Sequence, residues 1–354
     1  MLRQRLSADF CRDTSGFVEL ISNRKEHVMK ISKSLKVAMI ATSLATGFCH
    51  AETVSVETTV CDEEGGPVTN AVVHIRSLRF IGLGAGSSNS HFAEFEQETD
   101  GAGKVTMRFD CPSADFQYWV SAPECYSSER QCGHFKMVQS QSDLSLKLLE
   151  KRKDVSVTLR RKHNPIRMVG YGAYSNVRIP RRGGTIGFDL EKGDFVAPDG
   201  AGRVADLYLT QEWSNVVGIA AGCASLPFEG VGNGAYIATC KDGSLFKSDY
   251  IAETNATFAT RFEYLFGREE NIAKQGGNYL VEEGRYLVLR TRCIVDEAGK
   301  VRECHYSKIY GPLSIEGGRF CFKSYAFNPN CNDPNLEFDV SDNIMRKDTG
   351  VLLT

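Results

Sequence analysis

Carboxylates concentrated between residues 183 and 209 are the side chains of this chain best suited to acid–base chemistry. They are Asp189, Glu191, Asp194, Asp199 and Asp206, in the segment GGTIGFDLEKGDFVAPDGAGRVADLYL. Two carboxyl groups held about 5 Å apart, or about 6.5 to 9.5 Å apart, can hydrolyse a glycosidic bond. Acids that alternate with glycine are equally typical of solvated turns. Because spacing along the chain does not fix a separation in space, we assign no catalytic residue.

Aromatic rings near this acidic segment suggest a second possibility, a surface that binds carbohydrate. Tyr171, Tyr174 and Trp213 flank the segment, and we take them together with Asp189 and Asp194 as candidate ligand-binding residues. Rings with one polar end suit such a surface when they are exposed. The alternative is that the three rings belong to the hydrophobic core.

The remaining motifs do not indicate a catalytic or metal site. Five histidines follow residue 51, without an HExxH or a GxSxG pattern. Cys125, Cys132 and His134 could be drawn as a zinc site, but structural zinc usually shows a CxxC pair. The glycine-rich stretch GLGAGSS (82–88) lacks the lysine of a phosphate-binding loop. We therefore predict no metal and no cofactor.

The segment from residue 29 to residue 51 has the three parts of a secretory signal peptide. Three lysines precede a mainly apolar stretch, 37–48, that is too short to span a bilayer. Small residues then lead to a predicted cleavage after Ala51, which places the protein in the periplasm or outside the cell. A lipoprotein anchored through Cys49 is the alternative, but bulky Phe48 disfavours it.

An even number of cysteines remains after this cut, as an exported and oxidised protein requires. The ten are Cys61, Cys111, Cys125, Cys132, Cys223, Cys240, Cys293, Cys304, Cys321 and Cys331. We expect Cys293 to face Cys304 across a hairpin, at the cross-strand spacing that a disulfide needs. Nearness along the chain pairs Cys125 with Cys132, Cys223 with Cys240 and Cys321 with Cys331, which leaves Cys61 for Cys111.

Composition and charge exclude several classes of partner. The chain is 42% hydrophobic and 24% charged, which is typical of a globular protein. Its net charge of −2 becomes −6 without the first 51 residues, because 34 Lys and Arg then stand against 40 Asp and Glu. Such a chain lacks the basic field that holds nucleic acid or anionic lipid. We expect no nucleic-acid partner and no transmembrane segment in the mature chain.

Short runs of alternating apolar and polar residues recur after residue 51, whereas a long helical period is missing. The predicted strands are 53–60, 104–110, 116–122, 154–160, 203–210, 285–295 and 319–327. Residues 60–75 predict a hairpin at the end of the first strand. DGAGKV (100–105), DGAGRV (199–204) and DEAGKV (296–301) each predict a type I hairpin turn closed by a left-handed glycine. Calcium loops are the alternative, but one or two acids per turn supply too few oxygens.

Two family resemblances follow from these segments, on either side of a boundary near 161–166. The first region resembles the carboxypeptidase regulatory-like, prealbumin-type β-sandwich family through DEEGGPVTNAVVHI (62–75), TDGAGKVTMRF (99–109) and YWVSAPECY (118–126). The second resembles a domain that accompanies such modules in uncharacterised exported bacterial proteins, through 183–209, 291–313 and 327–339. The first resemblance implies an accessory module without catalytic residues, and neither implies a known activity.

Together these features predict an all-β, disulfide-bonded protein of two domains. We expect a mis-assigned or unstructured leader at 1–28, a signal peptide at 29–51, a prealbumin-like or Ig-like sandwich at 52–163 and a second antiparallel β-rich domain at 164–354. The predicted function is a non-catalytic binding or structural module at the cell envelope or outside the cell, with an envelope protein or a glycan as partner. The alternative is a polysaccharide-acting hydrolase with its carboxylates in the second domain.

Overall fold

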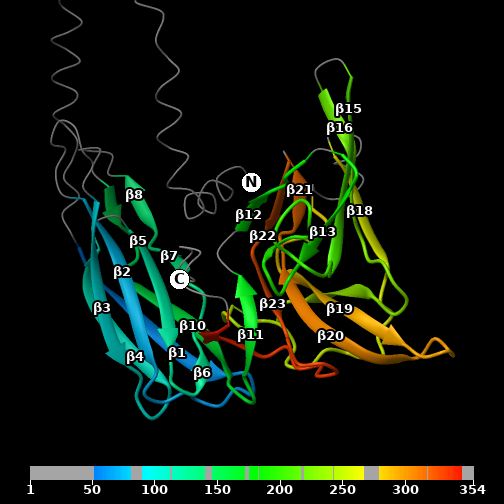
Figure 1. Ribbon diagram of the computed structural model, residues 1–354. Coiled ribbons are helices and arrows are strands. Elements are labelled where there is room, and N and C mark those ends of the chain that lie inside the picture. Colours follow the sequence, from blue (N-terminus) through cyan, green and yellow to red (C-terminus); the bar gives the residue numbers. More distant parts are fainter. Residues whose placement is uncertain are drawn as a thin grey trace, which may run out of the picture. The chain divides into compact units, whose positions relative to one another are not determined.

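The chain is all-β: every regular element that the structure describes is a strand (Figure 1). The computed structural model describes residues 52–80, 90–111, 114–139, 146–171, 175–181, 183–216, 219–241, 243–266, 279–316 and 318–344. The predicted leader and signal peptide, the stretch 82–88 and Tyr174 lie outside these ranges. The chain forms two compact units that divide between Leu159 and Arg160. Each unit is described separately below.

Unit 1 contains two four-stranded sheets. Its strands are β1 (Glu52–Asp62), β2 (Val72–Phe80), β3 (Ser90–Glu98), β4 (Lys104–Cys111), β5 (Asp115–Ser121), β6 (Cys125–Tyr126), β7 (Gln131–His134), β8 (Met137–Gln139), β9 (Leu146–Leu148) and β10 (Arg152–Arg161). One sheet has the order β4-β1-β10-β6 and the other β3-β2-β5-β7, while β8 and β9 form a separate ribbon. β1 pairs with β10 in parallel and with β4 in antiparallel orientation.

The two sheets of unit 1 pack face to face as a sandwich. Every second residue of β1 is buried, in the period of two that its sequence predicts. Val56 and Val60 of β1 share one core cluster with Val73 and Ile75 of β2, from the opposite sheet. Side chains from both inner faces therefore build a single hydrophobic core.

The predicted hairpin at 60–75 forms only at its tip, where Cys61 and Pro67 make an antiparallel bridge and the amide of Val68 donates to the carbonyl of Val60 at 3.1 Å. Asp62 Oδ1 accepts hydrogen bonds from the amides of Glu64 at 3.1 Å and Gly66 at 2.7 Å, which closes a tight turn directly after β1. The chain then crosses to the other sheet and enters β2 at Val72. β2 does not extend this bridge along β1, because β4 and β10 occupy both sides of β1 as far as Thr59.

Unit 2 contains three sheets. Its strands are β11 (Ile166–Tyr171), β12 (Ser175–Arg178), β13 (Thr185–Asp189), β14 (Asp194–Phe195), β15 (Leu207–Val216), β16 (Ile219–Pro227), β17 (Gly234–Thr239), β18 (Arg261–Phe266), β19 (Arg285–Val295), β20 (Val301–Tyr310), β21 (Ser314–Glu316), β22 (Arg319–Phe322), β23 (Ser324–Phe327) and β24 (Phe338–Asn343). Their orders are β17-β19-β20-β23-β11-β24, β12-β22-β21 and β14-β13-β15-β16-β18.

The six-stranded sheet of unit 2 is buried on both faces along β19. Leu287 and Leu289 join a core cluster with Phe188 of β13 and Leu209 of β15. Their neighbours Tyr286 and Val288 point to the other face and join a second cluster. A strand buried on both faces is a run of apolar residues rather than an alternation, which is why YLVL occurs within β19.

Two of the three predicted glycine turns have the predicted geometry. Asp100 and Asp296 each accept, through the backbone carbonyl, the amide of the glycine three residues on, at 3.0 and 2.9 Å. Their side chains accept two further turn amides each. Gly103 and Gly299 have φ angles of 70° and 78°, in the left-handed region. The turn at Asp296 is a hairpin turn between the paired strands β19 and β20, whereas the turn at Asp100 joins β3 to β4, which belong to different sheets.

The third predicted turn, DGAGRV, has a different structure. The carboxylate of Asp199 binds the Nε of Arg181 at 3.0 Å and accepts no turn amide in the described residues. Asp194 Oδ2 accepts the amide of Ala201 instead, at 2.8 Å. Asp189 Oδ2 accepts the amides of Arg203 and Val204. Acids from earlier in the chain therefore fold this loop, and the hairpin prediction is wrong here.

Replacing the left-handed glycine by alanine should reduce the free energy of unfolding by different amounts in the two turns. A Cβ on Gly103 would lie 2.4 Å from the carbonyl oxygen of Val60, whereas a Cβ on Gly299 would meet open space. We expect Gly299→Ala to cost about 1 to 2 kcal/mol, from the left-handed backbone alone. Gly103→Ala should cost clearly more. Urea unfolding of each variant measures both losses, and equal losses would contradict the close approach at Gly103.

Candidate functional site

Three of the five candidate carboxylates converge on one arginine, Arg292, rather than on an open cleft. Arg292 lies on β19, where the register with β20 shifts between Thr291 and Ile294, so that the strand forms a bulge. Its φ angle is 53°, which is uncommon for a residue with a side chain. The bulge directs the guanidinium toward the loop that follows β13. Below, the Arg292 centre means Arg292 with Asp189, Glu191, Asp206 and Thr291.

The guanidinium of Arg292 bonds to all three carboxylates. Its Nε donates to Asp206 Oδ1 at 2.9 Å, and one terminal nitrogen donates to Asp206 Oδ2 at 2.9 Å and to Asp189 Oδ1 at 3.0 Å. The other terminal nitrogen donates to Glu191 Oε2 at 2.6 Å. Arg292 also lies over the ring of Phe327, with 4.6 Å between the guanidinium carbon and the ring centre.

Backbone amides and one hydroxyl complete the centre. Asp189 Oδ1 also accepts the amides of Glu191 at 3.0 Å and Lys192 at 3.1 Å. Asp206 Oδ1 accepts the hydroxyl of Thr291 at 2.8 Å, and its Oδ2 accepts the amide of Leu190 at 2.9 Å. Together with the loop amides bound by Asp189, these contacts give each carboxylate oxygen of Asp189 and Asp206 at least two donors.

Burial makes this centre electrostatically demanding. The side chains of Asp189 and Asp206 are 2% and 0% exposed, that of Arg292 is 16% exposed and that of Glu191 is 39% exposed. Burial raises the pKa of Asp206, while the hydrogen bonds and charge of Arg292 oppose the rise. Burial alone would lower the pKa of Arg292, but Asp206, Glu191 and Asp189 raise it. The ionised pair is thus stable only as a pair.

These contacts suit a structural role better than acid–base catalysis. A general acid or base must reach the proton that it transfers, at about 2.6 to 3.2 Å. Asp189 and Asp206 are buried, and their oxygens are occupied by internal donors. Asp194 is similarly engaged, since its two oxygens accept the amides of Phe195 and Ala201, each at 2.8 Å. Asp199 is held by Arg181.

The sequence gives the acids of this centre but not its arginine. Arg292 occupies an ordinary position in the second half of RYLVLRTRCIV, and no local pattern there marks the bulge. Of the aromatic candidates, Tyr171 ends β11 and Trp213 lies within β15, where it pairs with Gly222. Their side chains lie outside the described part of the structure, as does all of Tyr174.

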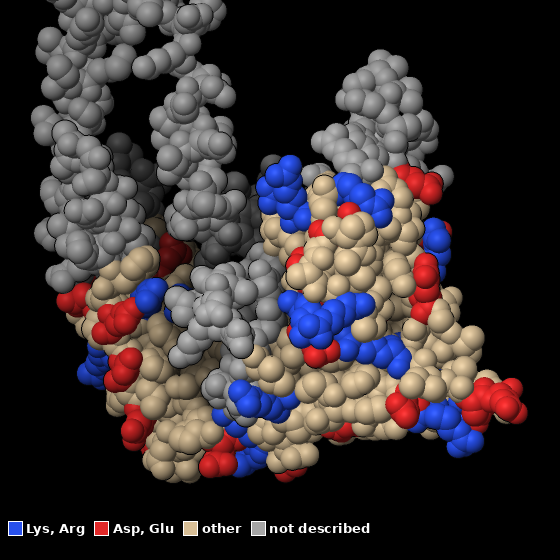
Figure 2. Space-filling model, viewed as in Figure 1, with Lys and Arg blue, Asp and Glu red and all other residues tan. Residues whose placement is uncertain are grey.

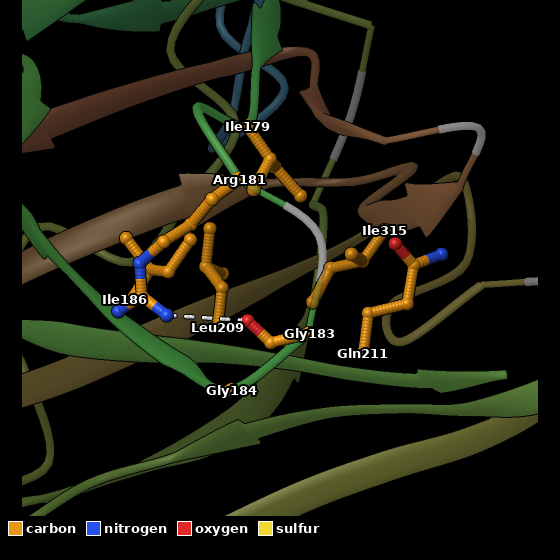
Figure 3. A pocket seen from close by; sticks show the side chains of 8 residues that line it. All are labelled: Ile179, Arg181, Gly183, Gly184, Ile186, Leu209, Gln211 and Ile315. Atoms are coloured by element: carbon orange, nitrogen blue, oxygen red, sulfur yellow. Dashed lines mark hydrogen bonds between the residues drawn. The ribbon is translucent and has the colours of Figure 1, made fainter. Parts of the chain in front are cut away.

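A small hollow lies beside the acidic loop (Figure 3). It encloses about 220 Å³, including space open to solvent. Its lining is Ile179, Arg181, Gly183, Gly184, Ile186, Leu209, Gln211 and Ile315. Arg181 is engaged by Asp199 and by the carbonyl oxygens of Gly183 and Thr185. The hollow therefore has a mainly apolar wall and a cation that is already neutralised.

A second buried basic side chain lies on the other face of the six-stranded sheet. Lys308 of β20 is 2% exposed, and its Nζ donates to Ser248 Oγ at 2.8 Å. The Nζ also lies 4.2 Å from the ring centre of Phe246 and 5.2 Å from that of Tyr310. Burial lowers the pKa of Lys308 well below its ordinary value, and the charge of Arg160 lowers it further.

The cysteines do not form the predicted bridges. None of the five predicted pairs is joined by a disulfide, because at least one member of each pair is among the cysteines outside any disulfide: Cys61, Cys111, Cys125, Cys223, Cys240, Cys293, Cys304, Cys321 and Cys331. Register alone excludes Cys61 with Cys111. Cys111 lies opposite Glu52, nine residues before Cys61 on β1, and that length of strand spans roughly 30 Å. A disulfide needs Cα atoms within about 7 Å.

One predicted pair does bring its sulfurs together. The thiols of Cys293 and Cys304 lie near each other across the β19–β20 hairpin, and burial together with this neighbour raises the pKa of Cys293 to about 11. Both side chains belong to the second core cluster of unit 2. Cys293 directly follows Arg292, so the bulge separates the pair from ideal register. A bridge between them stays a prediction of the sequence.

The structure also separates the residues drawn as a zinc site. Cys125 is buried in the core of unit 1, whereas His134 is exposed and bonds to Asp115 Oδ1 at 2.6 Å. Among the described residues, no group of three or more His, Cys, Asp or Glu side chains could hold a metal ion. No helix in these ranges is long and apolar enough to cross a membrane.

Comparisons with known proteins leave the family open. No protein-family model matches the chain, and neither does any curated protein. Among solved structures, 3-chlorocatechol 1,2-dioxygenase from Rhodococcus opacus aligns at 10% identity and a TM-score of 0.24, over 32% of this chain and 62% of its own. The chain thus spans less than two thirds of that protein.

Two pilins align over more of the chain. The major pilin SpaD from Corynebacterium diphtheriae has 12% identity and a TM-score of 0.23, over 81% of this chain and 84% of its own. The shaft pilin SpaA from Lactobacillus rhamnosus has 11% identity and a TM-score of 0.20, over 77% and 94%. At these TM-scores the likeness says nothing about what this chain does.

The Arg292 centre predicts a large loss of stability when its cation is removed. Arg292→Gln leaves two buried carboxylates without their shared counter-charge, and we expect a loss of about 3 to 5 kcal/mol. The matched control is Arg302→Gln on β20, which removes an exposed ion pair with Asp296 and should cost less than about 1 kcal/mol. Urea unfolding measures both. A similar small loss for the two variants would show that Arg292 does not organise the loop.

Lys308 predicts a pH-dependent gain of stability on its removal. In the unfolded chain the amine of Lys308 is protonated below about pH 10.4. In the folded chain it becomes protonated only below its lowered pKa. Lys308 therefore lowers stability most at and below that pKa, and the loss fades as pH rises toward 10. Lys308→Met should raise the unfolding midpoint at pH 7, with an advantage that shrinks by pH 10. Exposed Lys300→Met is the control, and a constant difference across pH would contradict a neutral buried amine.

Proposed function

We propose that this chain is an exported, non-catalytic module that binds a protein or a glycan at the cell envelope or outside the cell. The observation that carries the proposal is the complete internal use of the candidate carboxylates. Asp189 and Asp206 bind Arg292 and loop amides, and Asp194 binds two further amides. Acids held in this way stiffen a scaffold, and a binding protein needs a stiff scaffold more than it needs a reactive group.

Export is supported by the N-terminal segment and by the position of the first strand. Residues 29–51 have the charge, apolar stretch and small residues of a signal peptide. β1 begins at Glu52, the residue that follows the predicted cleavage site. The finer part of the proposal, periplasm or exterior after cleavage at Ala51, rests on these two features.

The described surfaces favour binding through flat strand faces rather than through a deep pocket. On the face that Figure 2 shows, acidic and basic side chains are interspersed with much uncharged surface. On the β3-β2-β5-β7 sheet, Trp119 stacks on His74 with 4.9 Å between ring centres, and Arg130 lies 4.5 Å from its ring. Arg76 lies over the ring of Phe92. The ring of Trp119 is thus already in contact with His74 and Arg130. A partner would therefore bind to the polar faces of the strands.

The test is a glycan array and an envelope-protein capture with the purified protein, beside an assay for glycan turnover. We expect binding without turnover, and the same binding by Asp194→Asn and Glu191→Gln, because these acids act inside the protein. Both substitutions retain side-chain size, and circular dichroism confirms that each variant is folded. Turnover that either substitution abolishes would instead support the polysaccharide-acting hydrolase. If the purified protein binds neither a glycan nor an envelope protein, the proposal is wrong.

A further inference from the structure

Two arginines lie directly opposite each other on the three-stranded sheet of unit 2. β12 and β22 are antiparallel neighbours, and Arg178 pairs with Arg319 in their register (Figure 1). Both side chains are exposed, whereas Phe320 of the same strand is buried in the core. The alternation of β22 therefore fixes the two guanidinium groups on the outer face of this sheet.

The register places the two arginines at the closer kind of antiparallel position. The amide of Ile179 donates to the carbonyl of Gly318 at 2.9 Å, so the neighbouring pair is the hydrogen-bonded one. Arg178 and Arg319 are then a non-hydrogen-bonded pair, with Cα atoms about 4.5 Å apart and side chains that start close together. Like charges directly opposite each other in this way destabilise a sheet.

Neither guanidinium is bonded to another side chain in the described part of the chain. Arg178 and Arg319 have no ion pair or hydrogen bond there. Exposed Arg181, Arg261 and Arg302 of unit 2 each have a carboxylate partner, whereas exposed Arg203, like this pair, has no ion pair in the described residues. A like-charge pair that costs stability is typical of a site kept for a ligand, since functional positions are where favourable packing is given up.

We propose that Arg178 and Arg319 together bind the oxyanions of an acidic polysaccharide, either uronate carboxylates or sulfate esters. The proposal rests on the binding function proposed above and names its ligand and its site. A guanidinium presents paired N–H groups that match a carboxylate or sulfate in two-point contact. Two such groups, side by side on a flat strand, could take one oxyanion between them or two successive ones along a chain.

The neighbouring residues favour a glycan over a protein partner. The next outward pair is Asn176 with Cys321, where the thiol donates to Asn176 Oδ1 at 3.6 Å. None of the large apolar side chains exposed in the described residues lies on β12, β21 or β22. Protein interfaces usually centre on a buried apolar or aromatic anchor. A surface of arginine and amide without such an anchor suits a hydrated, charged chain.

The third strand supplies an internal comparison. Glu316 of β21 pairs with Arg319 from the side opposite to Arg178. From this register position, we expect the charge of a glutamate to oppose an incoming oxyanion. Removal of that charge should therefore strengthen binding, whereas removal of either arginine should weaken it. A merely structural role for the three residues would not produce this opposite pair of effects.

The experiment measures the affinity of the purified protein for three defined oligosaccharides and one peptide by calorimetry. The probes are an oligogalacturonate, a heparin-derived oligosaccharide, a neutral malto-oligosaccharide and poly-glutamate. We expect one or both acidic oligosaccharides to bind, with at least about a tenfold loss in Arg178→Gln and in Arg319→Gln. Glu316→Gln should bind more tightly. Arg261→Gln, an exposed but paired arginine, should bind like the unaltered protein.

Thermal unfolding of the same variants shows whether each of them is folded. Arg178→Gln and Arg319→Gln should keep or raise the melting temperature, because each relieves a like-charge contact. Three results would overturn the proposal: equal binding of acidic and neutral oligosaccharides, acidic binding unchanged in both arginine variants, or poly-glutamate bound as tightly as the oligosaccharides. If glycans bind with the same affinity to both arginine variants as to the unaltered protein, the proposed site is wrong but the binding function stands. If nothing binds, the binding function fails with it.

Discussion

A buried pair of carboxylates that must be neutralised is the constraint on which unit 2 depends. Asp189 and Asp206 lie where water cannot solvate them, and an unpaired charge there would cost several kcal/mol. Arg292 supplies the counter-charge from the β19–β20 hairpin, about a hundred residues further along the chain. Because the three groups are stable only together, the loop between β13 and β15 and the bulge of β19 must form in one arrangement. The unusual φ of Arg292 is the local cost of that arrangement.

Other buried basic side chains of the unit are also bound by internal polar groups. Lys308 and Arg160 are buried against the ring of Phe246, and their polar groups are matched to a serine hydroxyl or to backbone carbonyls. Such buried polar groups define one packing among several of similar hydrophobic quality. The surface differs, because Arg178 and Arg319 have no ion pair or hydrogen bond within the described ranges. The contrast between charges satisfied inside and charges left open outside is what connects the fold to a binding role.

Local chemistry could be predicted from the sequence, and non-local chemistry could not. Alternation predicted β1 within two residues, the apolar run of β19 marked that strand, and the local turns at Asp100 and Asp296 formed, because each depends on neighbours along the chain. The same motif at Asp199 failed, since Asp189 and Asp194 bind its amides. The pairing of Cys61 with Cys111 failed because it required a sheet order. Arg292 was missed because a bulge leaves no mark on an alternating pattern.

A double-mutant cycle between Arg292 and Asp206 tests the central claim most directly. It compares the free energies of unfolding of Arg292→Gln, Asp206→Asn and the double variant with that of the unaltered protein. If the two groups are stable only as a pair, loss of the second should cost little once the first is gone, and the coupling should exceed about 2 kcal/mol. Additive losses, within about 0.5 kcal/mol, would contradict the account, because they would mean that each residue stabilises the fold independently of the other.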